Sequence, residues 1–321
     1  MMPYQDIYRH GQIIERGERE CASRWESLRR EYGAGRVIPL TVVDVGAAEG
    51  YFSVRWAETY RSTVVALDPS PALLETAQAH PELPLIVCRK TLTPADLWEF
   101  GRCEHVDLTL CLNVLHHFGA DWAKAIEAVL TWGGALVFET PDPLDTRACH
   151  AVYLPDLFHA LVKTLPSTIF ARPQSHTSAN HPRWMGRLLT AKSFLVSPYW
   201  EAPPGVQRPG AVYIYHDYAV PIAQDYKKFG AWPRKGGRRS WIPGINLATY
   251  LALDGRWPTR EALAACVRQT VAALVVRHGD IHPWNWIVTG DPACPMQLID
   301  YGDWTSDDAE GLAWTLKALE G

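Results

Sequence analysis

Two acidic side chains stand where the sequence predicts the ends of neighbouring strands. Asp44 belongs to a β-branched run that starts at Thr41, and Asp68 closes the run that starts at Ser62. In nucleotide-binding sheets, an acid about 20 residues beyond a glycine-containing turn accepts hydrogen bonds from ribose hydroxyls. Asp68 is therefore expected to hold the ribose of a nucleoside. The alternative is that Asp68 only caps the helix that follows it.

The turn after the first predicted strand narrows the choice of cofactor. It reads Gly46-Ala-Ala-Glu-Gly50, and glycine at both ends lets the backbone bend and approach a ligand closely. The pattern differs from the dinucleotide fingerprint G-x-G-x-x-G, because Glu49 stands where a pyrophosphate needs neutral or positive surroundings. The sequence thus favours a cofactor that has an adenosine end and no phosphate.

Alternating strand and helix signals surround this turn and must position it. Strands are expected near 38–45, 63–67, 84–88, 106–111 and 134–139, followed by a closing pair at 167–170 and 187–189. Helices are expected near 13–32, 52–60, 70–79, 93–99, 120–130 and 153–164. Such alternation predicts an α/β fold with a doubly wound, Rossmann-like parallel sheet. The helix at 13–32 either covers the cofactor cleft as a lid or packs on the sheet.

Three segments carry a resemblance to a known family. They are Val43-Asp-Val-Gly-Ala-Ala-Glu-Gly50, Val65-Ala-Leu-Asp68 and Leu110-Cys-Leu-Asn-Val-Leu-His-His-Phe118. In this order they resemble the first, second and fourth motifs of class I S-adenosylmethionine-dependent methyltransferases. The resemblance implies S-adenosyl-L-methionine as cofactor. The cofactor-binding residues it implies are Asp44, Gly46, Ala48, Glu49, Gly50, Asp68, Arg89 and Asn113.

Two adjacent histidines stand beside the implied transfer site. His116 and His117 follow the fourth predicted strand. Histidine titrates near neutral pH, so either residue could remove the proton of a hydroxyl acceptor. A phosphate acceptor is already anionic and needs no base. The structural alternative is that one histidine stacks over the cofactor or anchors the next helix.

A second pair of motifs lies near the carboxyl end. The segments from 277 to 288 and from 297 to 303 resemble the catalytic loop and metal motif of the protein-kinase-like and aminoglycoside-phosphotransferase-like fold. The resemblance implies that Asp280 is a catalytic base and that Asn285 and Asp300 are magnesium ligands. A methyltransferase followed by a shortened kinase-like module is similar to bifunctional methyltransferase–kinases of bacterial surface polysaccharide synthesis. This reading adds ATP and Mg²⁺ as cofactors.

Changes in composition suggest where domains meet. We expect a methyltransferase domain at 1–195, a proline- and glycine-rich linker at 196–210 and a smaller C-terminal α+β kinase-like module at 211–321. A basic segment at 227–239 either holds a phosphate or forms a solvated loop. A net charge of −4 implies no general affinity for nucleic acid, and no apolar run is long enough for a membrane span. Seven cysteines without a Cys-x-x-Cys pair indicate reduced thiols and a cytoplasmic protein.

The function expected from these features is methyl transfer from S-adenosylmethionine to a hydroxyl or phosphate of a small molecule or glycan. One alternative is a bifunctional methyltransferase–kinase that phosphorylates and methylates a polysaccharide end. The other is a scaffold in which both sites only bind ligands. The sequence identifies neither the acceptor nor the oligomeric state.

Overall fold

The computed structural model describes residues 2–33, 41–104, 106–146, 148–173, 182–189, 214–215, 218–219, 242–274, 278, 281–299 and 308–320. The alternation of strands and helices expected between 38 and 139 is present in it. The strands of this part are β3 (Thr41–Val45), β4 (Thr63–Leu67), β5 (Leu85–Cys88), β6 (Leu108–Leu112) and β7 (Ala135–Thr140). The helices are α2 (Tyr51–Tyr60), α3 (Pro71–Gln78), α4 (Pro94–Cys103) and α5 (Trp122–Leu130), which the 3₁₀ segment Leu115–Asp121 precedes.

Among the described residues, eight strands form one sheet in the order β13-β5-β4-β3-β6-β7-β9-β8. The three further strands are β8 (Ser167–Ala171), β9 (Trp184–Leu189) and β13 (Gly255–Trp257). Strands β3 to β7 run parallel, and β9 lies antiparallel between β7 and β8. The chain runs from β3 out to β5 and then places β6 on the other side of β3, so the strand order reverses between β3 and β6. Ligands of doubly wound sheets bind at such a reversal, beyond the carboxyl ends of the strands. The expected fold class is confirmed.

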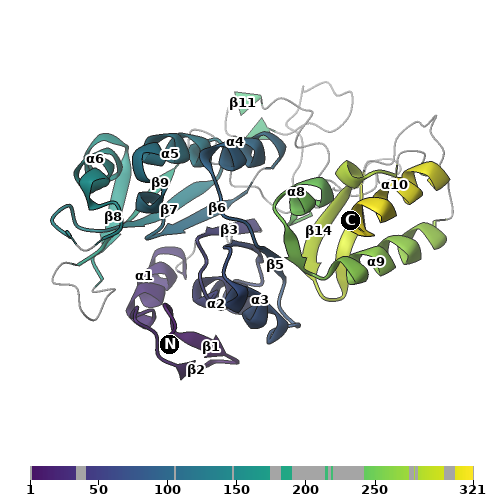
Figure 1. Ribbon diagram of the computed structural model, residues 1–321, viewed down its shortest axis with the longest axis horizontal. Helices are drawn as coiled ribbons and strands as arrows, with labels where there is room; N and C mark the ends of the chain where they lie inside the picture. The colour runs from purple at the N-terminus through teal and green to yellow at the C-terminus, as the bar shows by residue number, and fades with distance from the viewer. Residues whose placement is uncertain are drawn as a thin grey trace.

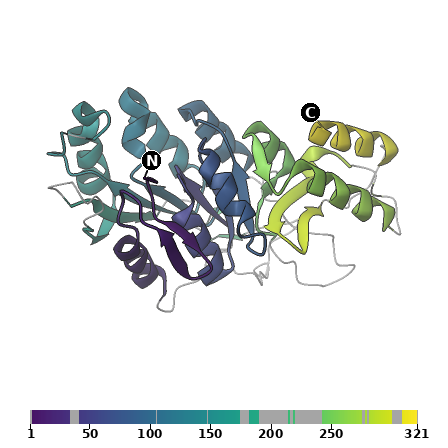
Figure 2. The ribbon, with the colours of Figure 1, turned by 60° about the horizontal axis from the view of Figure 1, so that its bottom comes forward.

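Helices cover both faces of this sheet (Figure 2). On one face α4, α5 and α6 (Leu154–Phe158) contribute to a buried cluster, and on the other α1 (Ala22–Gly33), α2 and α3 contribute to a second. The first cluster includes Phe100, Val129 and Leu157, and the second includes Trp25, Trp56 and Leu73. Every residue of β3, β4, β5 and β6 is buried, as a parallel sheet covered on both faces requires.

The N-terminal segment differs from the helix expected to begin at residue 13. Gln12–Glu15 is strand β2, which pairs antiparallel with β1 (Ile7–Arg9). The turn between them passes through His10 and Gly11, both at positive φ. This expectation is therefore wrong before residue 22, because the left-handed turn reverses the chain and pairs its two arms. The apolar spacing that suggested a longer helix continues only within α1.

Helix α1 is fixed to the sheet by two ion pairs. Arg24 and Glu139 are both almost fully buried, and Arg24 Nη2 lies 2.5 Å from Glu139 Oε2. Arg187 Nη1 lies 3.1 Å from Glu31 Oε1 near the end of the helix. Of the two roles considered for this helix, packing on the sheet is the one that these contacts support.

The C-terminal module lies against the β5 edge of the sheet (Figure 1). Its elements are β12 (Ile245–Asn246), α8 (Leu247–Ala252), α9 (Arg260–Ala272), β14 (Trp286–Asp291), β15 (Cys294–Leu298) and α10 (Asp308–Glu320). Strand β13 from this module pairs antiparallel with β5. The buried carboxylate of Glu104 accepts hydrogen bonds from Asn246 Nδ2 at 3.0 Å and Thr249 Oγ1 at 2.6 Å. The module is thus joined to the larger sheet by a strand pairing and by buried polar contacts.

Several sequence features fall outside this description. The expected linker at 196–210 and the basic segment at 227–239 lie outside the described residues. Between them the structure describes Ile214–Tyr215, which pairs antiparallel with Tyr218–Ala219. Across the described ranges, every helix is too short or too polar to cross a lipid bilayer.

Candidate functional site

A cavity of about 390 Å³ opens at the carboxyl ends of β3, β4 and β6, where the strand order reverses. This volume is within the range of small-molecule sites, roughly 300–1,000 Å³. Of the residues expected from the sequence, the cavity is lined by Gly46, Ala48, Asp68, Asn113 and His117. The sheet therefore brings three separate sequence motifs to one cavity.

Gly46 shapes the floor of this cavity. Its φ of +73° is unfavourable for a residue that has a side chain, and its N–H donates to the carbonyl oxygen of Leu67 at 2.9 Å. A Cβ at this position would lie 2.6 Å from Cγ2 of Val114, which lines the same cavity. Glycine is thus required here both for the turn and for the close approach of the segment after β6.

Asp68 links the turn after β3 to the end of β4. Its Oδ2 accepts a hydrogen bond from the N–H of Ala48 at 3.0 Å, and its Oδ1 accepts one from the N–H of Ser70 at 2.8 Å. Each carboxylate oxygen keeps a further lone pair. Asp68 is therefore held in one orientation and can still accept hydrogen bonds from two hydroxyl groups in the cavity.

Tyr4, from the N-terminal segment, forms another wall. Its hydroxyl accepts a hydrogen bond from Asn113 Nδ2 at 3.0 Å. The backbone N–H groups of Tyr4 and Gln5 donate to the two carboxylate oxygens of Glu49, both at 2.9 Å. Asn113 Oδ1 is buried and has no hydrogen-bond partner among the described residues. This oxygen is suited to accept a hydrogen bond from an ammonium or amine group.

Of the residues expected for methyl transfer, five lie outside the lining: Asp44, Glu49, Gly50, Arg89 and His116. Asp44 is buried in β3 and accepts a hydrogen bond from Ser53 Oγ at 2.6 Å, and burial raises its pKa to about 6. Glu49 holds the N-terminal segment, and Gly50 begins α2 at a φ of +84°. The Arg89 side chain donates to the carbonyl oxygen of Pro69 at 3.2 Å. Their roles toward a cofactor stay predictions.

Some lining residues were missed by reasoning from the sequence. After β5 the family resemblance left Cys88, Arg89 and Lys90 open as contacts of the adenine and Arg89 was chosen, whereas Lys90 is the one of the three that lines the cavity. Val114 and Phe118 flank the histidine pair, and Tyr4 belongs to a segment without a motif. The one sequence signal that places Lys90 at the cavity is its position just after a predicted strand. No sequence signal indicated that Tyr4 lies there.

Residues 42–134, which contain most of this cavity, match the family model described as "Methyltransferase domain". This stretch forms a methyltransferase domain. The expected resemblance to methyltransferases is therefore confirmed for the part of the chain that builds the cavity. A comparison with curated proteins finds no matching sequence.

The chain also resembles solved structures. The bifunctional kinase-methyltransferase WbdD is 18% identical, with a TM-score of 0.47, and the match covers 96% of this chain and 81% of that chain. An O-methyltransferase family protein from Burkholderia thailandensis is 16% identical, with a TM-score of 0.37, and the match covers 53% of this chain and 57% of that chain.

Two adjacent histidines follow β6 in the methyltransferase domain. The rings of His116 and His117 have centroids 4.3 Å apart. Burial, with the charges of His117 and Arg183, lowers the pKa of His116 to about 2. Burial also lowers the pKa of His117, which lines the cavity. A general base works best when its pKa lies near the working pH, so His116 is a poor proton acceptor.

Two arginines add positive charge beside these histidines. Arg183 Nη2 lies 3.1 Å from Asp145 Oδ2, and the Cζ of Arg19 lies 4.8 Å from the ring centroid of Tyr4. In both arginines, Nε and Nη1 are buried and have no hydrogen-bond partner among the described residues. Burial and the charge of Arg19 lower the pKa of Arg183. Leaving buried hydrogen-bond donors without a partner costs free energy. Arg19 and Arg183 are therefore suited to bind an anion.

The kinase-like motif is described only in part. Asn285 is buried directly before β14, its carbonyl oxygen accepts a hydrogen bond from the N–H of Ile299 at 2.8 Å, and β14 pairs antiparallel with β15. Asp280 and Asp300 lie outside the described residues. The predicted magnesium ligands, the predicted base and the use of ATP therefore stay predictions.

We expect His116→Gln to make the protein less sensitive to acid. The folded state holds His116 neutral down to about pH 2, whereas the unfolded chain protonates it near its ordinary pKa of 6.5. Unfolded protein therefore binds more protons below about pH 6.5, and stability falls as the pH falls. Between pH 6.5 and pH 5 this residue removes about 2 kcal/mol of stability. Urea unfolding of both proteins at pH 7 and pH 5 measures the difference.

The contribution of Asp44 to stability depends on pH in the opposite direction, so Asp44 must be present in both proteins that are compared. Its pKa is raised from 3.8 to about 6, so its contribution grows as the pH falls and is lost as the pH rises through about 6. Both proteins contain Asp44, so the comparison isolates His116. His159→Gln, at an exposed histidine, is the matched control and should keep the wild-type pH dependence. Equal loss of stability in wild type and His116→Gln would contradict the prediction.

Proposed function

We propose that this protein is an S-adenosylmethionine-dependent O-methyltransferase whose acceptor is an anionic oxygen, a phosphate or carboxylate, on a small molecule or glycan end. One observation carries the proposal. The cavity that contains the strand-end acid Asp68 and His117 lies near Arg19 and Arg183, whose buried Nε and Nη1 atoms have no hydrogen-bond partner among the described residues. Tyr4 connects the two, because it lines the cavity and lies against Arg19.

The cavity fits the cofactor through three groups of different chemistry. Asp68 offers two negatively charged oxygens to the ribose hydroxyls. Asn113 Oδ1, buried and unpartnered among the described residues, suits the α-ammonium group of a methionine moiety. The turn at Gly46 leaves backbone exposed at the cavity floor. When bound there, S-adenosylmethionine would supply a methyl group on a positively charged sulfur.

The electrostatics of the acceptor side favour an anion over a neutral hydroxyl. A hydroxyl must lose its proton, but burial lowers the pKa of both histidines near the transfer site. An ionised phosphate or carboxylate needs no base. It also gains charge-assisted hydrogen bonds from Arg19 and Arg183, which are stronger than those between neutral groups.

The chain's own residues then have mainly positioning roles. Methyl transfer is an in-line displacement, so alignment of the reactants and exclusion of water contribute most to the rate. Glu49 and Asn113 hold Tyr4 in the cavity wall before any ligand binds. The arginines would hold the acceptor oxygen, and His117 would pack beside it.

Labelled methyl transfer to paired acceptors tests the proposal. The purified protein is first titrated with S-adenosylmethionine by calorimetry, and binding is expected. It is then incubated with methyl-labelled cofactor and phosphorylated or carboxylated sugars, each beside its neutral counterpart. Label should enter the anionic members only. Label in the neutral sugars would exclude the anionic acceptor, and absence of cofactor binding would exclude methyl transfer altogether.

We expect Arg19→Gln to weaken the acceptor side alone. With the cofactor product S-adenosylhomocysteine present, the affinity for inorganic phosphate should fall about tenfold, which corresponds to about 1.4 kcal/mol. The variant loses charged donors that have no other partner among the described residues. Calorimetry should show unchanged affinity for S-adenosylmethionine. Arg9→Gln, at an exposed arginine of β1, is the control, and an equal loss in both variants would contradict a specific site.

A further inference from the structure

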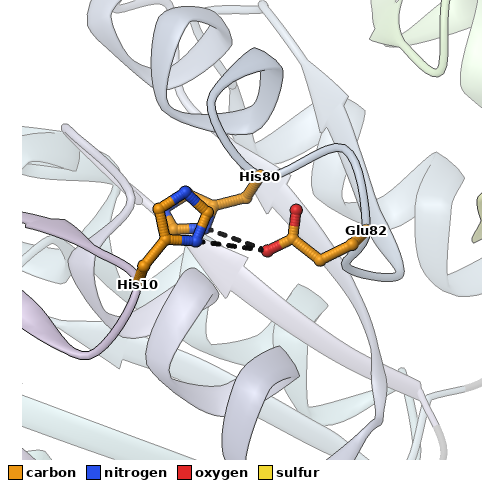
Figure 3. A group of neighbouring side chains, drawn as sticks. All are labelled: His10, His80 and Glu82. Carbon is orange, nitrogen blue, oxygen red and sulfur yellow. Dashed lines mark ion pairs between the residues drawn. The ribbon is translucent and has the colours of Figure 1, made fainter.

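Two histidines and a glutamate meet where the N-terminal hairpin contacts the rest of the domain (Figure 3). His10 lies in the turn between β1 and β2, and His80 and Glu82 lie in the loop between α3 and β5. Nδ1 of His10 and Nδ1 of His80 are 3.7 Å and 3.5 Å from the same oxygen, Oε1 of Glu82. One potential ligand atom from each residue lies within 4.8 Å of the other two.

The hydrogen bond of His80 determines which of its two ring nitrogens carries a proton and which keeps a lone pair. Its Nε2 lies 3.2 Å from the carbonyl oxygen of Tyr8, which can only accept a hydrogen bond. Nε2 must therefore carry a proton, and in the neutral ring Nδ1 is left with its lone pair. In that form the lone pair faces the carboxylate of Glu82, 3.5 Å from its Oε1, and the His80 side chain is only 1% exposed. A cation between them would turn this repulsion into attraction.

The donor set and its spacing match zinc. Zn²⁺ binds imidazole nitrogen and carboxylate oxygen at about 2.0–2.2 Å, and tetrahedral geometry then separates two ligand atoms by about 3.3 Å. Shortening the distances from Glu82 Oε1 to His10 Nδ1 and His80 Nδ1 to this value requires movements of a few tenths of an ångström, and the two imidazole nitrogens, which lie within 4.8 Å of each other, must also approach. His10 and Glu82 can supply them, because their side chains are 68% and 51% exposed.

His80, the third potential ligand, is already oriented to bind a metal ion. Histidines that bind metals commonly donate their other N–H to a backbone carbonyl or carboxylate, which fixes the ring and its tautomer. The contact between His80 and Tyr8 has this arrangement, and Tyr8 belongs to the same hairpin as His10. The hairpin thus provides one ligand directly and orients another.

We propose that His10, His80 and Glu82 bind one divalent transition-metal ion, for which Zn²⁺ is the best match, with a fourth position open to water. The ion joins the β1–β2 hairpin to the loop between α3 and β5. Strand β1 of this hairpin begins three residues after Tyr4, which lines the cavity. The site is separate from the methyl-transfer residues and does not depend on the proposed acceptor.

Titration of metal-free, full-length protein with Zn²⁺ tests the site. Calorimetry should detect one ion that is bound at least tenfold more weakly by His10→Ala and by Glu82→Gln. Zn²⁺ should also raise the unfolding temperature of the wild type more than that of either variant. Both substitutions are at exposed side chains, so the variants should fold normally, and their unfolding temperatures without Zn²⁺ should match the wild type.

Matched variants separate this site from other zinc-binding groups. His159→Ala and Glu75→Gln remove exposed residues of the same types elsewhere and should keep wild-type zinc binding. Zinc binding that is unchanged in His10→Ala and Glu82→Gln would overturn the proposal. So would a wild type whose unfolding temperature does not respond to Zn²⁺. If the variants are less stable by the same amount with and without Zn²⁺, the cluster is an ion-pair group and binds no metal.

Discussion

Replacing Asp68 by asparagine should weaken the binding of S-adenosylmethionine about 100-fold. A loss of about 100-fold corresponds to about 2.8 kcal/mol, which lies within the range of about 1.5–3 kcal/mol for one hydrogen bond to a charged group. Asparagine keeps the shape and one acceptor oxygen but loses the charge. Calorimetric titration of both proteins with the cofactor measures the change directly.

A structural role of Asp68 must be distinguished from binding. The carboxylate also accepts hydrogen bonds from the N–H groups of Ala48 and Ser70, so the substitution could loosen the turn. The unfolding temperature of Asp68→Asn is therefore recorded beside its affinity. Glu75→Gln, on the exposed side of the following helix, is the matched loss of charge and should leave affinity unchanged. An Asp68→Asn protein that binds the cofactor as tightly as wild type would refute the assignment of the ribose site.

Arg24→Met should reduce the free energy of unfolding by about 3–5 kcal/mol, the range found when one partner of a buried ion pair is removed. Arg24 and Glu139 side chains are 3% and 0% exposed. Arg24 Nε donates to Glu139 Oε2 at 2.7 Å, which ties α1 to the end of β7. The variant leaves a carboxylate buried without this partner. Urea unfolding at pH 7 measures the loss.

The double variant shows whether the unpaired charge causes the effect. Arg24→Met combined with Glu139→Leu removes both charges, so it should be more stable than Arg24→Met alone. Arg29→Met provides the surface comparison on the same helix. The Arg29 and Glu26 side chains are 55% and 49% exposed, and removing such a pair should cost about 0–1 kcal/mol. Equal destabilisation by Arg24→Met and Arg29→Met would contradict the importance of burial.

Local sequence was sufficient to predict the parallel part of the sheet. Runs such as 41–45 and 63–67 combine β-branched residues with a following turn, and both properties depend on neighbours in the chain. Gly46 and Asp68 could be assigned to the cavity for the same reason, because parallel strands bring their carboxyl ends to one edge. The helix expected from residue 13 was wrong where a left-handed turn at His10 and Gly11 formed a hairpin instead.

The sequence by itself therefore determined three things. They are the order of the strand-end motifs along the chain, the places of Gly46 and Asp68 at the cavity, and the match of residues 42–134 to a methyltransferase domain. Only the tertiary structure decided which side chains from distant parts of the sequence lie beside these residues. Tyr4 reaches the cavity through Glu49, and Arg183 lies beside the end of β7 because β9 inserts antiparallel there. The lowered pKa of His116 likewise follows from burial. Residue spacing reports local periodicity, whereas burial, charge and ligand geometry depend on contacts between segments far apart in the chain.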